Sequence, residues 1–172
     1  MPTLADMDGP RPKLDIVVIG IGNAYRNDDG AGIVVARRLS ELAIDGLTIL
    51  EESGEGTSLI DAWGEAGLVI IIDAVRSGAE PGVIHRFDAT SREIPAHLFS
   101  YSTHAFGVAG AIGLAHALGR LPRRLIVYGI EGRDFESGTT LTSEVEAVVP
   151  LAVKAVVQEI ENHSQVSVPT NA

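Results

Sequence analysis

The chain has no cysteine, few aromatic residues and few basic ones. Its 172 residues include 13 Lys and Arg against 23 Asp and Glu, a formal net charge of −10. Without cysteine there is no disulfide, thiolate metal site or thiol nucleophile, so a bound metal would need carboxylate, imidazole or carbonyl ligands. The acidic balance argues against nucleic acid as a partner, because negative charge on the protein repels phosphates.

Long hydrophobic runs are absent as well. No apolar stretch approaches the roughly 18–20 residues of a membrane-spanning helix, and the first dozen residues lack the apolar segment of a secretory signal. We therefore expect a cytoplasmic protein with no membrane partner. A hydrophobic content of 45% favours one domain with a sizeable core. We expect a flexible arm over residues 1–13, a single domain over 14–162 and a disordered tail over 163–172.

Short apolar runs alternate with helical patterns along the chain. Unbroken runs such as 68–72 are typical of parallel strands buried on both faces, and the short connection from this strand to the next favours an antiparallel edge hairpin. The fold class is predicted to be α/β, a three-layer α/β/α sandwich whose mostly parallel five-stranded sheet has one antiparallel edge strand. The expected strands cover residues 15–20, 47–50, 68–72, 83–87 and 124–130; the expected helices cover 30–43, 58–63 and 104–118, with a last helix from Thr142 or Ser143.

The first strand leads into a glycine turn and then into two adjacent carboxylates, Asp28 and Asp29, where a helix begins. A helix N-terminus normally attracts an anion. Two aspartates at that place would repel a phosphate and suit a cation. Ligands of open α/β sheets bind at the carboxyl ends of the strands, an edge that would also receive Asp73 and, from the loop before a helix, His104. These oxygen and nitrogen donors suit a divalent cation such as Zn, Ni, Co or Mn.

Each of these residues also has an ordinary structural interpretation. One aspartate of the 28–29 pair could cap the first helix, and Asp73 could be a turn residue after its strand. A lone histidine at a helix start is more often a hydrogen-bonding surface group than a ligand. Two glutamates at strand ends, Glu51 and Glu131, could be solvated side chains or could serve as a general base.

Three motifs occur in order along the chain: Gly20-Ile-Gly-Asn23 followed by Asp28-Asp-Gly-Ala-Gly32, then Ile72-Asp-Ala74, then Ser102-Thr-His104. This ordered set resembles the nickel–iron hydrogenase maturation proteases. The resemblance extends from about residue 14 to residue 161 and implies a mixed sheet with helices on both sides, in agreement with the fold predicted above.

The resemblance also implies an activity and a site. In that family the acidic residue at the position of Asp29, the aspartate at Asp73 and the histidine at His104 bind the metal, which makes these three the expected catalytic and metal-binding residues. The implied reaction is endopeptidase removal of a C-terminal extension from a hydrogenase large-subunit precursor after nickel insertion. Nickel would then be supplied by that partner, although another divalent metal could substitute. Asp28 is expected to be the helix cap.

Two other functions stay open at this point. A non-catalytic nickel-binding chaperone or adaptor could use the same residues and would differ only in lacking turnover. A dinucleotide-binding enzyme would need a third glycine where the chain has Tyr25. Glu51, at the end of the second strand, is the one feature that fits ribose binding.

Overall fold

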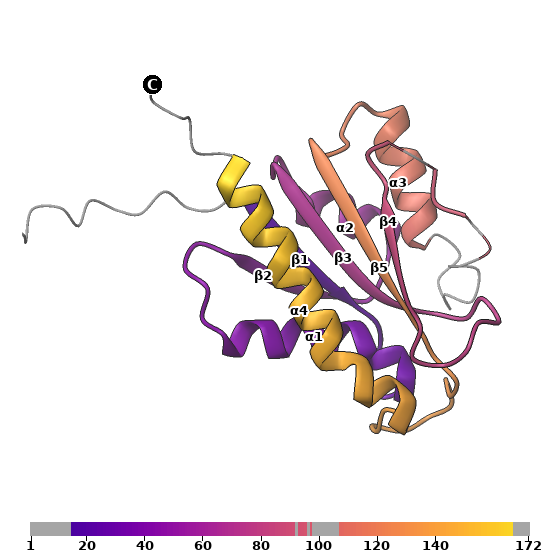
Figure 1. The fold of residues 1–172 in the computed structure, drawn as a ribbon. Coiled ribbons are helices and arrows are strands. Elements are labelled where there is room, and N and C mark those ends of the chain that lie inside the picture. The colour runs from indigo at the N-terminus through magenta and orange to yellow at the C-terminus, as the bar shows by residue number, and fades with distance from the viewer. Residues whose placement is uncertain (1–14, 92, 96, 98–106, 167–172) are drawn as a thin grey trace, which may run out of the picture.

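The computed structural model describes residues 15–91, 93–95, 97 and 107–166. One five-stranded sheet runs through the domain with helices on both sides (Figure 1), which confirms the predicted α/β class. The elements are β1 (Ile16–Ile21), the short 3-10 helix η2 (Asn27–Gly30), α1 (Ala31–Glu41), β2 (Thr48–Glu52), α2 (Gly56–Trp63), β3 (Leu68–Val75), β4 (Ile84–Asp88), α3 (Val108–Ala117), β5 (Arg124–Glu131) and α4 (Ser143–Val166).

The strand order is β2-β1-β3-β5-β4, with β4 antiparallel to β5 and all other pairs parallel. The predicted antiparallel edge strand is confirmed. The predicted hairpin between 68–72 and 83–87 is wrong, because β5 lies between β3 and β4. Every residue of β5 after Arg124 is buried, whereas those of β4 are half-buried or exposed. The more apolar strand therefore takes the inner position and β4 the edge.

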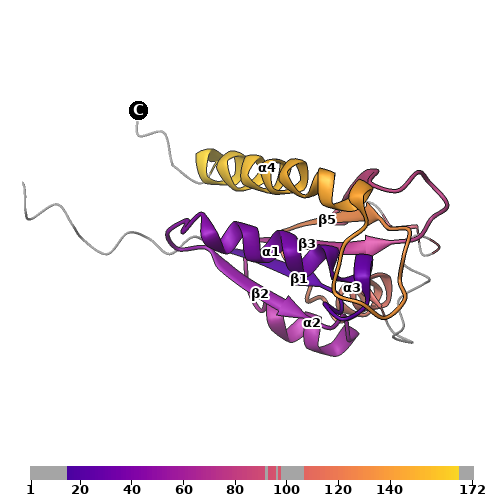
Figure 2. The same cartoon turned by 90° about the horizontal axis from the view of Figure 1, so that it is seen from below.

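Side chains of alternate strand residues point to opposite faces, and each face has its own core. On one face α2 and α3 pack against the sheet, with Trp63 and Ala111 buried there. On the other face α1 and α4 lie side by side, as Figure 2 shows, and bury Leu39 and Val156 among others. The sheet is thus the middle layer of three.

Two helix boundaries differ from the prediction. The helix expected from residue 104 begins at Val108, because Gly107 has an extended backbone and its carbonyl accepts the first helical hydrogen bond, from Ala111. The expected capping residues of this helix lie outside the described residues. The last helix begins at Ser143, as predicted, and continues to Val166, so residues 163–166 of the expected tail are helical.

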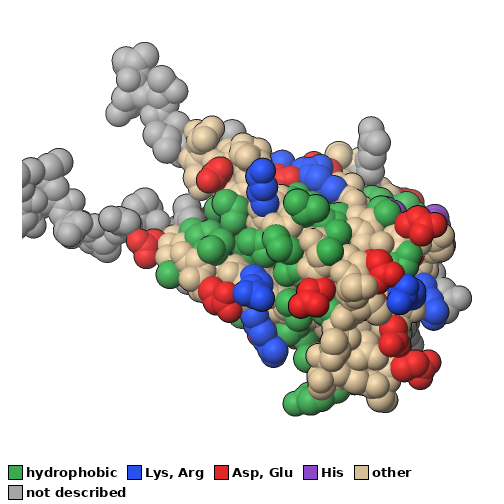
Figure 3. Space-filling view, turned by 60° about the horizontal axis from the view of Figure 1, so that its bottom comes forward, with side chains coloured by type: hydrophobic (Ala, Val, Ile, Leu, Met, Phe, Trp, Pro, Cys, Tyr) green, Lys and Arg blue, Asp and Glu red, His purple; other side chains and the backbone are tan. Residues whose placement is uncertain are grey.

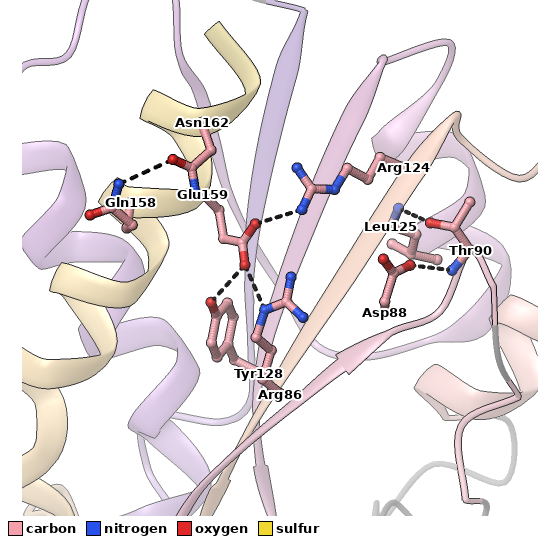
Figure 4. A network of polar contacts seen from close by, with 9 residues as sticks. All are labelled: Arg86, Asp88, Thr90, Arg124, Leu125, Tyr128, Gln158, Glu159 and Asn162. Atoms are coloured by element: carbon pink, nitrogen blue, oxygen red, sulfur yellow. Dashed lines mark hydrogen bonds and ion pairs between the residues drawn. The ribbon is translucent and has the colours of Figure 1, made fainter. Parts of the chain in front are cut away.

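A buried carboxylate fastens α4 to β4 and β5. Glu159 is 6% exposed, and its Oε1 accepts hydrogen bonds from Arg86 Nε at 2.6 Å and the Tyr128 hydroxyl at 3.2 Å, while Oε2 accepts from Arg124 Nη2 at 3.0 Å (Figure 4). We call these four residues the Glu159 cluster. Its donors offset the cost of burying the charge, so the cluster fixes the second half of α4 against the sheet.

The outer surface over α1 and α4 is mixed. Figure 3 shows hydrophobic side chains between the two helices, with acidic and basic side chains around them. Val34 of α1 and Val148 of α4 are partly buried and pack on the core. Among the helices that the structure describes, none combines the length and apolar character needed to cross a membrane.

Candidate catalytic site at the carboxyl edge of the sheet

Two glycines allow the start of α1 to lie directly on the strands. Gly22, with φ of +144°, runs so close to the turn that a Cβ atom there would overlap the carbonyl oxygen of Asp29. A Cβ atom at Gly32 would overlap the carbonyl oxygen of Ile72. Only glycine permits backbones to approach this closely. The glycine motif therefore brings Asp29 beside the end of β3, where the residue after Ile72 is Asp73.

Asp73 is buried, with 7% of the residue exposed. Burial disfavours the charged carboxylate, and the negative charge of Asp29 adds to this effect. Together they raise the pKa of Asp73 to about 7, against the opposing effect of a backbone hydrogen bond from Ala74. Two carboxylates that repel each other at a buried sheet edge would be stabilised by a cation. The structure thus brings together two of the three residues expected to bind metal, and their oxygen atoms suit a divalent ion.

His104 lies outside the described residues, so its role stays a prediction. Within the described part of the chain, no three His, Cys, Asp or Glu residues form a group that could hold a metal ion. The helix α3, which follows His104 in the sequence, packs on the face of the sheet to which the Asp73 side chain points. Ile71, Asp73 and Val75 are every second residue of β3, so their side chains point to the same face of the sheet. Ile71 and Val75 belong to the same hydrophobic core as Val108 at the start of α3.

The expectation that Asp28 caps the first helix is wrong. Neither η2 nor α1 has a side-chain cap, and the buried Asp28 carboxylate instead accepts hydrogen bonds from the backbone N–H groups of Arg133, Asp134 and Thr142. Burial by itself would raise the pKa of Asp28, but these hydrogen bonds outweigh it and lower the pKa. Asp28 is therefore a charged residue that joins η2 to a distant loop.

Both glutamates that were considered as a general base accept hydrogen bonds from other side chains or from the backbone. Glu51 accepts two hydrogen bonds from the Arg37 guanidinium, at 2.8 and 2.9 Å, which lower its pKa. The buried Glu131 accepts hydrogen bonds from the backbone and hydroxyl of Ser77, both at 2.7 Å, and lies 3.2 Å from His85 Nε2. Both carboxylates hold local structure together. Glu51, the one residue that fitted ribose binding, is thus already paired with Arg37.

Comparison with known proteins identifies the family of the chain. A family model described as hydrogenase maturation protease matches residues 33–159. The chain belongs to the hydrogenase maturation protease family. It is thus placed among endopeptidases, as the sequence motifs predict, and the dinucleotide-binding alternative is set aside.

Individual relatives agree with this assignment. The hydrogenase expression/formation protein HupD of Rhizobium leguminosarum bv. viciae is 31% identical over 159 residues, covering 90% of this chain and 78% of that protein. The hydrogenase 2 maturation protease of Escherichia coli K12 is 27% identical, covering 91% and 97%. The solved structure of the hydrogenase maturating endopeptidase HybD from E. coli superimposes with a TM-score of 0.75 at 26% identity, covering 86% of this chain and 93% of that one. The fold of this chain is therefore that of the maturation proteases.

Proposed function

We propose that this maturation protease removes a C-terminal extension from the large-subunit precursor of a nickel–iron hydrogenase in the cytoplasm, and that it recognises nickel already inserted in that precursor. Asp29, Asp73 and His104 would provide the recognition. The observation that carries the proposal is the pair of repelling carboxylates, Asp29 and Asp73, near the carboxyl end of β3. The names of the relatives support a hydrogenase as the target.

The carboxylate pair makes recognition conditional on the metal. With its pKa near 7, Asp73 is partly protonated at neutral pH, and a neutral carboxyl is a poor metal ligand. Binding of nickel would displace this proton, because ligands bind metals in their deprotonated form. A nickel-free precursor brings no positive charge to offset the repulsion between Asp29 and Asp73. We therefore expect it to bind weakly and to stay uncut.

Nickel seated between the precursor and these side chains would polarise the scissile carbonyl or activate a water molecule. The enzyme's own contribution is geometric and electrostatic. The end of β3 holds the Asp73 carboxylate in a buried place with low water content, where charge interactions are strong. The glycine contacts at the start of α1 keep Asp29 on the same side. The fold thus prepares a negative site for a cation that arrives with the substrate.

The test is a cleavage assay with the purified protein and a large-subunit precursor in nickel-loaded and nickel-free forms. Release of the C-terminal peptide, measured by mass spectrometry, is expected with the loaded precursor and not with the nickel-free one. Equal cleavage of both forms would overturn nickel recognition. Stoichiometric binding of the loaded precursor without any released peptide would favour the chaperone or adaptor function.

Substitutions test the residues. Asp29→Asn, Asp73→Asn and His104→Ala are expected to lose cleavage. Asp61→Asn is a matched control, because Asp61 is an exposed aspartate of α2 that lies 3.5 Å from Arg120 on another part of the surface. Full processing by any of the three variants would remove that residue from the site.

A further inference from the structure

Asp28 is fully buried, and its carboxylate receives donors from a single segment. Oδ2 accepts the N–H groups of Arg133 at 2.8 Å and Asp134 at 2.9 Å. Oδ1 accepts the N–H group of Thr142 at 2.7 Å, and the Thr142 hydroxyl lies 2.9 Å from Oδ2. All three partners belong to residues 132–142, which connect β5 to α4 and which we call the β5–α4 loop.

Further hydrogen bonds join the same loop to the turn that carries Asp28. The Asp28 N–H donates to the Asp134 carbonyl at 2.9 Å, and the Asn27 N–H donates to the Gly138 carbonyl at 3.0 Å. The Gly138 N–H donates to the Tyr25 carbonyl at 3.0 Å, and the Asn27 side chain donates to the Asp134 carboxylate at 3.0 Å. The segment from Tyr25 to Asp28, directly before Asp29, is therefore bonded to the β5–α4 loop at several points.

The turn has reason to need this restraint. The next residue, Asp29, is repelled by Asp73, and η2 contains only the four residues Asn27–Gly30. Short 3-10 helices have poor hydrogen-bond geometry, and Asn27 has a left-handed backbone with φ of +44°. The bonds from Asp28 to the β5–α4 loop oppose a displacement of Asp29 away from the sheet edge.

We propose that Asp28 is a positioning residue that holds Asp29 opposite Asp73 through the β5–α4 loop. The inference rests on the proposed function, because it assumes that Asp29 and Asp73 act together on a metal. Residues that orient a metal ligand without touching the metal change affinity or activity about 10–100-fold when they are replaced. An effect of that size is expected at Asp28.

The first variant is Asp28→Asn, which keeps the shape of the side chain but turns one acceptor oxygen into a donor that faces N–H groups. Three quantities are measured: hydrogen exchange of the amides of Arg133, Asp134 and Thr142, affinity of the protein alone for Ni²⁺ by calorimetry, and kcat and KM with nickel-loaded precursor. We expect faster amide exchange, Ni²⁺ binding weaker by about tenfold or more, and kcat lower by about 10–100-fold with KM changed less than about threefold.

Two other variants complete the test. Glu159→Gln is the matched control, because it also alters a buried carboxylate with several donors but lies in the Glu159 cluster; its Ni²⁺ affinity and kcat are expected to stay within about twofold of wild type. Thr142→Val removes the hydroxyl donor and leaves Asp28 charged. It is expected to weaken Ni²⁺ binding in the same direction by a smaller factor, and it decides the matter if Asp28→Asn does not fold.

The outcomes separate this inference from the proposed function. Wild-type Ni²⁺ affinity and kcat in Asp28→Asn, despite faster exchange in the loop, would overturn the positioning role. If Asp29→Asn has lost Ni²⁺ affinity and catalytic activity in the same experiment, the proposed site stands and only the role of Asp28 is wrong. If Asp29→Asn also behaves like wild type, the site itself is wrong.

Discussion

Asp73 and Glu159 are buried to nearly the same extent, 7% and 6% exposed, yet the fold treats the two carboxylates in opposite ways. Glu159 meets two guanidinium groups and a hydroxyl, whereas Asp73 meets a backbone N–H and the negative charge of Asp29. A buried carboxylate is costly unless it is paired. The fold supplies the partners of Glu159, whereas within the described residues no positively charged group is found to pair with Asp73. The two carboxylates are therefore distinguished by their charged neighbours and not by their burial.

The largest difference is expected in cleavage. Asp73→Asn should lower kcat/KM with nickel-loaded precursor by at least about 100-fold if Asp73 is a ligand of the metal, as proposed above. Glu159→Gln should leave it within about twofold. Initial rates of peptide release for the two variants, each shown by circular dichroism to be folded, measure the contrast. Equal losses of kcat/KM in the two variants would mean that activity follows stability, and that Asp73 and Glu159 do not differ in function.

The next effect concerns stability in the absence of metal. The pKa of Asp73 is about 7 in the folded protein, against about 3.9 for an unfolded chain. Between these values the folded state binds the extra proton, so this carboxyl makes the protein less stable as pH rises from about 4 to 7. Asp73→Asn removes that penalty and should be more stable than wild type by up to about 4 kcal/mol at pH 8 and equal to it near pH 4. Urea unfolding at both pH values tests this, and a variant less stable at pH 8 would contradict it.

Glu159→Gln should act in the other direction. The substitution removes the charge that pairs with Arg86 and Arg124, and it is expected to destabilise the protein by about 1–2 kcal/mol at pH 7. The effect is moderate because the two arginine side chains are 42% and 34% exposed and water screens them. Gln158→Ala, next to it on α4, is the control and should change the urea midpoint less. A neutral Glu159→Gln would show that the cluster contributes no net stability.

The smallest effect is expected at Glu51, whose carboxylate is exposed and pairs with Arg37. Surface ion pairs contribute little to stability. Glu51→Gln should therefore leave both the urea midpoint and the cleavage rate without a resolvable change. A tenfold fall in kcat would return Glu51 to consideration as the general base.

The sequence predicts most of the fold because its signals are local. The apolar run at 68–72 and the spacing of the last helix each identify an element without knowledge of the rest of the chain. The position of β5 between β3 and β4 is not predicted from the sequence, since strand order depends on which of two strands is buried more completely. The sequence also predicts too early a start for α3, because Gly107, directly before Val108, has an extended backbone.

The candidate site was predictable in part for the same reason. Asp29 follows β1, and both residues belong to short motifs, so the sequence places them at one edge. The sequence predicts β3 to end at residue 72, but the strand continues to Val75, so Asp73 is a strand residue and not a turn residue after it. The roles of Asp28 and Glu131 could not be predicted. Asp28 binds backbone N–H groups more than 100 residues away, and backbone donors leave no trace in the sequence. Glu131 is recognised only once the 76–83 connection is seen to fold back onto the end of β5.

The long separation between Asp28 and its partners has a consequence for the order in which the protein matures during its own synthesis. Asp29 and Asp73 are both made early, but the loop that restrains the η2 turn is made after residue 131. Contacts between residues so distant in sequence form late, because chain closure must come first. A partly synthesised chain would contain Asp29 and Asp73 but not the β5–α4 loop that holds Asp29 in position. The proposed metal-dependent cleavage would thus become possible only when the last strand and the last helix are in place, which ties the activity to the completeness of the fold.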